Sequence, residues 1–299
     1  MANKTKNKIK SKEESSFHSQ RPPQHQKKQP GRSYKMNPEP VYDLDYYRGT
    51  GKLEDKIAIV TGGDSGIGRS VSLLFAREGA DVTVVYLEET QDAKQTKKLV
   101  EEEGQRCLLV RGDLSQPDFC QEVAQKTLAE FGQINILVNN AAEQHVTSDF
   151  SRIAPEQLKQ TFATNFYSYF YLSQEVVSQM KEGDSIINTT SVTAYRGSGH
   201  LIDYASTKGA IVAFTRSLAK LLARRKIRVN AVAPGPIWTP LIPASFPAES
   251  VAQFGQDVPL GRAGQPIEVA PAYVYLASQD GSYITGQVMH PNGGEMVGS

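Results

Sequence analysis

The sequence predicts an α/β fold: one doubly wound parallel sheet of about seven strands with helices on both faces. Three observations lead to this prediction. Short runs rich in β-branched residues recur from residue 53 onward, and amphipathic stretches of helical period separate most of them. Strands that alternate with helices lie parallel and are joined by right-handed crossovers. A glycine-rich segment between the first strand and the first helix is typical of a Rossmann-type, dinucleotide-binding sheet.

Each expected strand is a short run rich in aliphatic residues. The expected strands span residues 56–61, 82–86, 107–111, 135–139, 185–190, 228–232 and 287–290. The sequence shows no repeat of fixed period beyond the alternation of strands and helices. One dinucleotide-binding catalytic domain is therefore expected over residues 53–299, a length that a single α/β domain routinely reaches.

The N-terminus differs in composition from the rest of the chain. Residues 1–35 hold ten Lys and Arg against Glu13 and Glu14, a net +8, which leaves 23 basic and 30 acidic residues elsewhere, a net −7. The segment has few apolar side chains to bury, so a disordered basic tail is expected, with no part in the core or the active site. It either solubilises the protein or contacts an acidic partner or an anionic surface. Residues 36–52 carry aromatic residues and prolines, which predicts an ordered surface arm.

Composition excludes several classes of protein. No apolar run reaches the roughly 18 residues of a membrane helix, and no apolar segment follows the basic N-terminus, so a cytoplasmic protein without a membrane partner is expected. The acidic body is a poor nucleic-acid surface, because phosphate binding depends on clustered positive charge. Cys107, Cys120 and the histidines match no metal-ligand spacing, so no metal site is expected. The two thiols are expected to be core or surface groups without a redox role.

A glycine-rich turn over residues 61–68, with the sequence TGGDSGIG, follows the first strand and precedes a helical pattern that begins at Arg69. Glycines allow a tight turn and the close approach of a pyrophosphate, whose charge is attracted by free N–H groups at a helix start. A glycine cluster can also be an ordinary tight turn, so the motif needs support from other parts of the chain. The cofactor-binding candidates in this turn are Gly62, Asp64, Ser65, Gly66, Ile67 and Gly68.

A second pattern follows the fifth expected strand. Ser191 lies at the end of this strand, and thirteen residues later Tyr204 begins a long helical stretch, with Lys208 four residues further on. Two residues four apart share one face of a helix. Free tyrosine has a pKa near 10, and a nearby cation stabilises its phenolate, which suits proton transfer at neutral pH. Tyr204 is therefore the candidate general acid or base, and Lys208 is the candidate for lowering its pKa.

Together these motifs resemble the classical short-chain dehydrogenase/reductase family, from the first strand to residues 292–294 near the C-terminus. The segment 112–114 is similar to the family's acidic segment beside the adenine ring, and 139–142 to its Asn-Asn-Ala-Gly segment, with Ala142 in place of the usual glycine. Segment 234–239 is similar to the Pro-Gly segment near the nicotinamide. The resemblance is greatest to glucose and ribitol dehydrogenase homologues and bacterial general stress oxidoreductases. It adds these cofactor-binding candidates to the glycine turn: Tyr86, Asp113, Leu114, Asn140, Ala141, Tyr204, Lys208, Pro234, Gly235, Ile237 and Thr239.

The resemblance implies an oxidoreductase that transfers a hydride between NAD(P) and the carbonyl or alcohol carbon of a small aldehyde, ketone, sugar or polyol. It implies that Tyr204 gives or takes the proton, and that Lys208 also binds the nicotinamide ribose. Ser191 would hold the substrate oxygen, and Asn165 would order a water in the proton relay. Two other functions stay open: a non-catalytic nucleotide-sensing regulator, and a sugar-nucleotide epimerase or dehydratase.

The resemblance also implies a homotetramer that pairs the long helices after the fourth and fifth strands. An aromatic run supports buried surface there; it comprises Phe162, Phe166, Tyr169, Phe170 and Tyr171. Residues 240–258, which are apolar and interrupted by prolines, are expected to form a lid over the substrate. Tyr195 and Trp238 are expected to pack or to line the pocket. His200 and Asp203, which flank Tyr204, either hold a polar substrate or belong to a solvated loop.

Cofactor choice depends on the end of the second strand, where NAD-selective relatives place an acid. Tyr86 occupies this position, but Ser65 stands where many NADP-binding relatives carry an arginine, and Arg69 lies one turn further into the helix. Asp64, Glu88 and Glu89 add negative charge nearby. The sequence therefore predicts use of both cofactors, with a mild preference for NADP.

Overall fold

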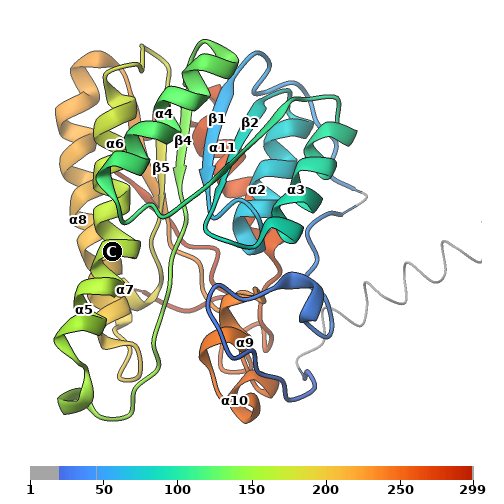
Figure 1. Cartoon of the computed structure of the whole chain (residues 1–299), viewed down its shortest axis with the longest axis vertical. Coiled ribbons are helices and arrows are strands. Elements are labelled where there is room, and N and C mark those ends of the chain that lie inside the picture. The colour runs from blue at the N-terminus through green and yellow to red at the C-terminus, as the bar shows by residue number, and fades with distance from the viewer. Residues whose placement is uncertain (1–19, 45, 298–299) are drawn as a thin grey trace, which may run out of the picture.

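The computed structural model of the chain describes residues 20–44 and 46–297, and it confirms the predicted fold class (Figure 1). One seven-stranded sheet has the order β3-β2-β1-β4-β5-β6-β7, and every neighbouring pair is parallel. The strands are β1 (Ile57–Thr61), β2 (Asp81–Tyr86), β3 (Cys107–Arg111), β4 (Ile136–Asn139), β5 (Ser185–Thr189), β6 (Arg228–Val232) and β7 (Val288–Met289). The strand order reverses between β1 and β4, and such a switch point leaves a crevice outside the carboxyl ends of the strands.

Successive side chains of each strand point to opposite faces of the sheet and so divide the core into two layers. In β1, Ala58 and Val60 belong to the cluster that covers one face, whereas Ile59 belongs to the cluster on the other. The first face carries α2 (Gly66–Arg77), α3 (Thr90–Glu102) and α11 (Pro266–Ala277). The second carries α4 (Pro117–Phe131), α6 (Ser168–Val177) and α8 (Ile202–Leu222). Burial on both faces explains why the strands read as nearly continuous apolar runs.

Short helices follow the carboxyl ends of the strands, at the lower end of the view in Figure 1. They are α5 (Pro155–Phe162), α7 (Thr193–Arg196), α9 (Leu241–Ser245) and α10 (Ala248–Ala252). One strand is shorter than predicted: β7 has two residues where the sequence suggested 287–290, and it pairs only with β6, at the edge of the sheet. Both cysteines are buried in the core, and burial raises the pKa of each thiol to about 12.

Residues 20–35 form a segment, here called the N-terminal strap, that lies along α9 and α10 (Figure 1). The Arg21 amide donates to the Ala252 carbonyl at 3.3 Å, and the Gln26 amide donates to the Pro243 carbonyl at 2.6 Å. A Cβ on Gly31 would lie 2.2 Å from the Pro240 carbonyl oxygen, so only glycine allows the backbones to approach this closely. The sequence prediction of a disordered tail is wrong for these residues, because their hydrogen-bond partners lie in the lid region. Residues 1–19, on which the same prediction falls, lie outside the described residues.

Trp238 links the strap and the following arm to the lid. Its ring is fully buried in a small apolar cluster with Met36 and Val251. The Arg21 guanidinium lies 4.5 Å from the ring centroid, and the indole Nε1–H donates to the Pro38 carbonyl at 2.9 Å. The expectation that Trp238 packs rather than reacts agrees with these contacts. Cation–π attraction and an indole hydrogen bond together hold the N-terminal segments against the lid.

Candidate active site

A cavity of about 700 Å³ lies outside the carboxyl ends of the strands, at the switch point that the topology predicts. Residues that end or follow each of the strands β1 to β6 line it, among them Gly62, Tyr86, Asp113, Asn140 and Ser191. Of the site residues predicted from the sequence, all but Gly68 and Asn165 line this cavity. The lid segment predicted at 240–258 contributes one wall through residues such as Leu241 and Phe246.

The glycine turn has the geometry that a pyrophosphate requires. Gly62 and Gly66 have φ values of 59° and 50°, in the left-handed region that glycine tolerates best. A Cβ on Gly68 would lie 2.1 Å from the Gly62 carbonyl oxygen, so Gly68 serves the close packing of turn and helix rather than the cavity wall. Helix α2 begins at Gly66, with Ser65 as its N-cap, and both residues line the cavity. Unpaired N–H groups at such a helix start fit the phosphates of a dinucleotide.

Charge around the end of β2 differs from the sequence expectation in one respect. Arg69 is buried, its guanidinium lies 2.8 Å from an Asp92 carboxylate oxygen, and it also donates to the Asp64 carbonyl. It is therefore engaged inside the protein and does not face a ligand. Asp64 lines the cavity, and burial raises the pKa of its carboxyl to about 6. Tyr86 closes the end of β2, with its hydroxyl 3.4 Å from the Thr90 hydroxyl.

The segment after β4 ties the centre of the sheet together. The amides of Asn140 and Ala141 both donate to the Thr61 hydroxyl, at 2.8 and 3.1 Å. Asn139 Nδ2 donates to Asn188 Oδ1 of the neighbouring strand at 2.9 Å. Among the described residues, the positive φ values outside glycine belong to Asp55 and Lys226, so Ala142 fits its place without left-handed backbone.

Tyr204 and Lys208 lie on α8, and Ser191 follows β5, so the sheet and one helix bring these three residues to the same end of the cavity. Lys208 is buried, its Nζ donates to the Thr189 carbonyl at 2.9 Å, and it lies 5.3 Å from the Tyr204 ring centroid. Burial lowers the pKa of Lys208 to about 7 and raises the pKa of Tyr204 to about 12. A hydrogen bond with the Ser191 side chain acts in the opposite direction on Tyr204 and lowers its pKa.

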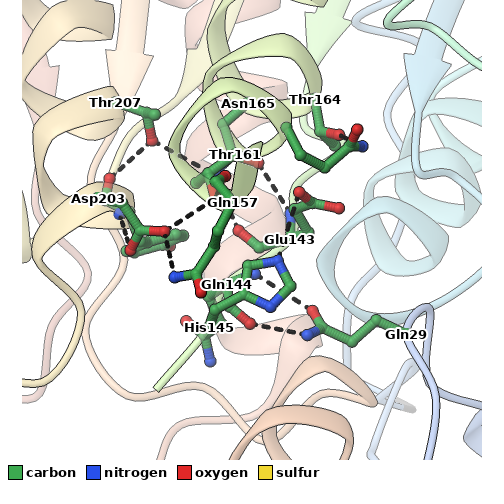
Figure 2. A network of polar contacts seen from close by, with 12 residues as sticks. Gln29, Glu143, Gln144, His145, Gln157, Thr161, Thr164, Asn165, Asp203 and Thr207 are labelled. Atoms are coloured by element: carbon green, nitrogen blue, oxygen red, sulfur yellow. Dashed lines mark hydrogen bonds and ion pairs between the residues drawn. The ribbon is translucent and has the colours of Figure 1, made fainter. Parts of the chain in front are cut away.

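Asn165 lies in a π-helical turn, Ala163–Tyr167, between α5 and α6. Its side chain receives the Glu143 amide hydrogen at 2.8 Å and donates to the Glu143 carbonyl and to the Thr207 hydroxyl (Figure 2). The Thr207 hydroxyl in turn donates to the Tyr204 carbonyl at 2.7 Å. The π turn places Asn165 behind the cavity wall, where it connects the loop after β4 to the helix that carries Tyr204.

Asp203 has a structural role that the sequence did not reveal. It is buried, and its carboxylate accepts hydrogen bonds from the Tyr204 amide, Gln157 Nε2 and the Thr161 hydroxyl, at 2.8 to 2.9 Å (Figure 2). These bonds fix α5 to the start of α8. The hypothesis that Asp203 holds substrate is therefore wrong, and so is its alternative of a solvated loop. Its neighbour His200 does line the cavity.

Sequence reasoning also missed the part of the cavity wall that the strap supplies. Gln29, Pro30 and Gly31 line the cavity. Gln29 and Gln144 exchange two hydrogen bonds (Figure 2). Gln144 Nε2 also donates to the Ser245 hydroxyl of α9 at 2.8 Å. No local signal in a polar, basic segment indicates these contacts, because each partner lies more than a hundred positions away in the chain.

The fold and the site define a dinucleotide-binding oxidoreductase, and comparison with known proteins identifies its family. A short-chain dehydrogenase/reductase family model, described as Enoyl-(Acyl carrier protein) reductase, matches residues 62–295. The chain is 56% identical to general stress protein 39 of Bacillus subtilis over 276 residues, which covers 92% of this chain and 96% of that protein. It is 49% identical to glucose and ribitol dehydrogenase of Daucus carota over 282 residues, with 92% and 97% covered. It is 50% identical to NADPH-dependent aldehyde reductase 1 of Arabidopsis thaliana over 281 residues, with 92% and 98% covered.

The chain therefore belongs to the short-chain dehydrogenase/reductase family, whose members are NAD(P)-dependent oxidoreductases. The subgroup that the sequence motifs indicated is confirmed as well. Within residues 20–44 and 46–297, no helix has the length and hydrophobicity to cross a membrane. Across the same residues, no three His, Cys, Asp or Glu side chains gather as a metal ion would require.

Proposed function

We propose that the protein interconverts the carbonyl and alcohol forms of a small polar substrate, an aldehyde, ketone, sugar or polyol, with Tyr204 as general acid and base. The observation that carries the proposal is the placement of Tyr204 in the cavity, hydrogen-bonded to Ser191 and backed by the buried Lys208. When bound, the nicotinamide supplies or accepts the hydride. The remaining steps belong to side chains of this chain.

Proton transfer depends on the surroundings of Tyr204. Because burial raises its pKa to about 12, the phenol is protonated at neutral pH and can donate its proton to a carbonyl oxygen during reduction. Ser191, which already bonds to Tyr204, can hold the same substrate oxygen in place. A charged Lys208 would stabilise the phenolate that forms. Asn165 bonds to the loop after β4 and to the helix that carries Tyr204, and so holds the two together.

The proposed substrate is polar because several polar side chains line the cavity together with Tyr204 and Ser191. They include Glu143, Gln144, Thr164, Thr193, Arg196 and His200. Hydrogen-bonding groups of this kind select ligands with hydroxyl or carbonyl groups, because an apolar ligand would leave them unpaired. The names of two relatives, one a glucose and ribitol dehydrogenase and one an aldehyde reductase, agree with this class.

We propose that the enzyme uses both NAD and NADP, with a mild preference for NADP. Tyr86, at the end of β2, places no carboxylate against the 2′-phosphate of NADP. The presence of both Tyr204 and Lys208 beside the cavity favours turnover over the alternative of a cofactor-sensing regulator. The test is an absorbance assay of the reduced nicotinamide with each cofactor over a panel of aldehydes, ketones, sugars and polyols. Cofactor binding without turnover on any of these would support the regulator instead.

A further inference from the structure

The strap bridges two sides of the cavity. At one end it is bonded to the lid through Ala252 and Pro243, and at the other the Ser33 amide donates to Asp92 Oδ2 of α3 at 3.0 Å. Between these points Gln29, Pro30 and Gly31 line the cavity, whose wall also includes Tyr86 and Leu87. The end of β2 is where a nucleotide-binding sheet meets the adenosine ribose. The strap therefore runs beside the part of the cavity in which NAD and NADP differ.

Two cations of the strap flank its cavity-lining residues. Lys28 Nζ forms an ion pair with Glu88, and Arg32 Nε lies 3.9 Å from a Glu89 carboxylate oxygen. Both glutamates follow β2 directly and precede α3. The Arg32 backbone is fixed as well, because its amide and its carbonyl both bond to the Gln26 side chain. The two positive charges are thus anchored next to the end of β2.

These two cations partly neutralise a group of acidic residues near the end of β2. Asp64, Glu88, Glu89 and Asp92 carry a formal charge of −4, and Arg69, bonded to Asp92, reduces it to −3. Lys28 and Arg32 reduce it further, to −1. Burial, with Asp64 and Glu88 close by, raises the pKa of Glu89 to about 7, whereas Arg32 acts in the opposite direction. The strap therefore reduces the negative charge beside this end of the cavity, where Asp64 lines the wall.

We propose that Lys28 and Arg32 set the cofactor preference of the enzyme, because they neutralise the acids after β2 and so allow the 2′-phosphate of NADP to bind. A phosphate monoester carries a charge of about −1.5 to −2 at neutral pH, so it responds far more strongly than a ribose hydroxyl to uncompensated carboxylates. The inference rests on the proposed dinucleotide-dependent function. It assigns to the N-terminal strap a task that the sheet and the glycine turn perform in other dinucleotide-binding folds.

Arg111 is another cation near the end of β2 and provides the main alternative. Arg111, at the end of β3, is exposed, and its Nε donates to the Leu87 carbonyl at 3.3 Å. It forms no ion pair with Glu88 or Glu89 among the contacts of the described residues. A preference that depends on Arg111 instead of the strap would contradict the assignment, so the two sources are tested side by side.

The experiment compares the full-length enzyme with a Lys28→Met/Arg32→Met double variant, which removes both charges but keeps long side chains. The kcat/KM values for NADP and for NAD are measured on one substrate, and the Kd of each oxidised cofactor is measured by isothermal titration calorimetry. The NADP/NAD ratio of kcat/KM should fall about tenfold and the NADP/NAD ratio of Kd should rise about tenfold, which corresponds to about 1.4 kcal/mol. High salt should shrink the difference, because it screens charges at the surface. Exchanging the charges, with Lys28→Arg and Arg32→Lys, should preserve the ratio.

Matched variants separate this effect from packing and from general charge. Glu88→Gln/Glu89→Gln should raise the NADP/NAD ratio of kcat/KM, because it removes the charges that the strap cations offset, and it tests the charge effect even if the double variant does not fold. Lys98→Met, which breaks an exposed ion pair with Glu102 on α3, should leave the ratio unchanged. An unchanged ratio in the strap variant, or a loss of NADP preference confined to Arg111→Met, would overturn the inference. Failure of the wild type to bind or turn over either cofactor would overturn the proposed function instead.

Discussion

Gln29 of the strap and Gln144 of the loop after β4 are joined by two reciprocal hydrogen bonds: Gln29 Nε2 donates to the Gln144 carbonyl at 2.7 Å, and the Gln144 amide donates to Gln29 Oε1 at 3.2 Å. Because Gln144 also bonds to Ser245 of α9, one pair of residues connects the strap, the central loop and the lid. A contact that joins three separate segments at a cavity wall restrains all of them.

Gln29→Ala is therefore expected to destabilise the protein and to loosen the lid. Two hydrogen bonds are lost and two backbone groups of Gln144 lose their partner, which costs on the order of 1–3 kcal/mol. Thermal unfolding should show a lower Tm, and limited proteolysis should cut residues 240–258 faster. Gln121→Ala, on the exposed surface of α4, serves as the control. Unchanged Tm and proteolysis in Gln29→Ala would show that the pair does not restrain the lid.

Tyr204→Phe is expected to abolish turnover, by a factor of at least about a thousand, while the Kd of the cofactor changes little. The substitution removes only the hydroxyl that transfers the proton and leaves the ring against Lys208 in place. Lys208→Ala should instead weaken both turnover and cofactor binding. Steady-state kinetics and calorimetry measure the two quantities separately. Wild-type turnover by the phenylalanine variant would contradict the assigned role.

Ser191→Ala is expected to move the pH profile of alcohol oxidation to higher pH. Oxidation needs the deprotonated Tyr204, so kcat/KM rises with pH until the pKa of Tyr204 is reached. The Ser191 hydrogen bond lowers that pKa, and its removal therefore raises the pKa and displaces the rising limb upward. Ser206→Ala, exposed on the same helix, is the control. A limb displaced to lower pH would contradict the direction of the Ser191 effect.

Asp203→Asn tests how Tyr204 is positioned. The amide keeps the shape of the carboxylate but loses accepting capacity toward Gln157 and Thr161, so unfolding is expected to become easier by about 1–3 kcal/mol. The start of α8 should shift, and kcat should fall more than KM rises. Denaturant unfolding and kinetics provide the two readouts, with Asp118→Asn on α4 as the exposed control. Unchanged unfolding and unchanged kcat would contradict the positioning role of Asp203.

The homotetramer suggested by the family resemblance stays a prediction, and an exposed aromatic surface supports it. Tyr167 and Phe170 are 43% and 40% exposed, and Phe170 packs on Phe214 of α8 at 5.5 Å between ring centroids. Phe170→Arg should dissociate the assembly, because a charge at an apolar interface is left unpaired. Light scattering should report the smaller species, whereas Tyr46→Arg on the arm should leave the mass unchanged. A monomeric wild type at micromolar concentration would contradict the prediction.

Local sequence patterns were enough to predict most of the fold and most of the residues that line the cavity. The strands could be predicted because burial on both faces makes each one an apolar run. The turn from Gly62 to Gly68 could be predicted because a strand pattern precedes it and a helix pattern follows it. The role of Asp203 could not be read in this way, because its partners Gln157 and Thr161 lie on a helix whose packing no local pattern specifies. The packing of the strap could not be predicted for the same reason, because Arg21 and Trp238, which are in contact, lie more than two hundred positions apart in the chain.

The burial of Trp238 between the Arg21 guanidinium and the Pro38 carbonyl gives the molecule a built-in optical reporter. The chain contains one tryptophan, so its indole emission comes from a single environment. Release of the strap would admit water to the ring and shift this emission to longer wavelength, in the intact protein and without any attached label. The attachment of the strap can therefore be followed in real time while cofactor is added.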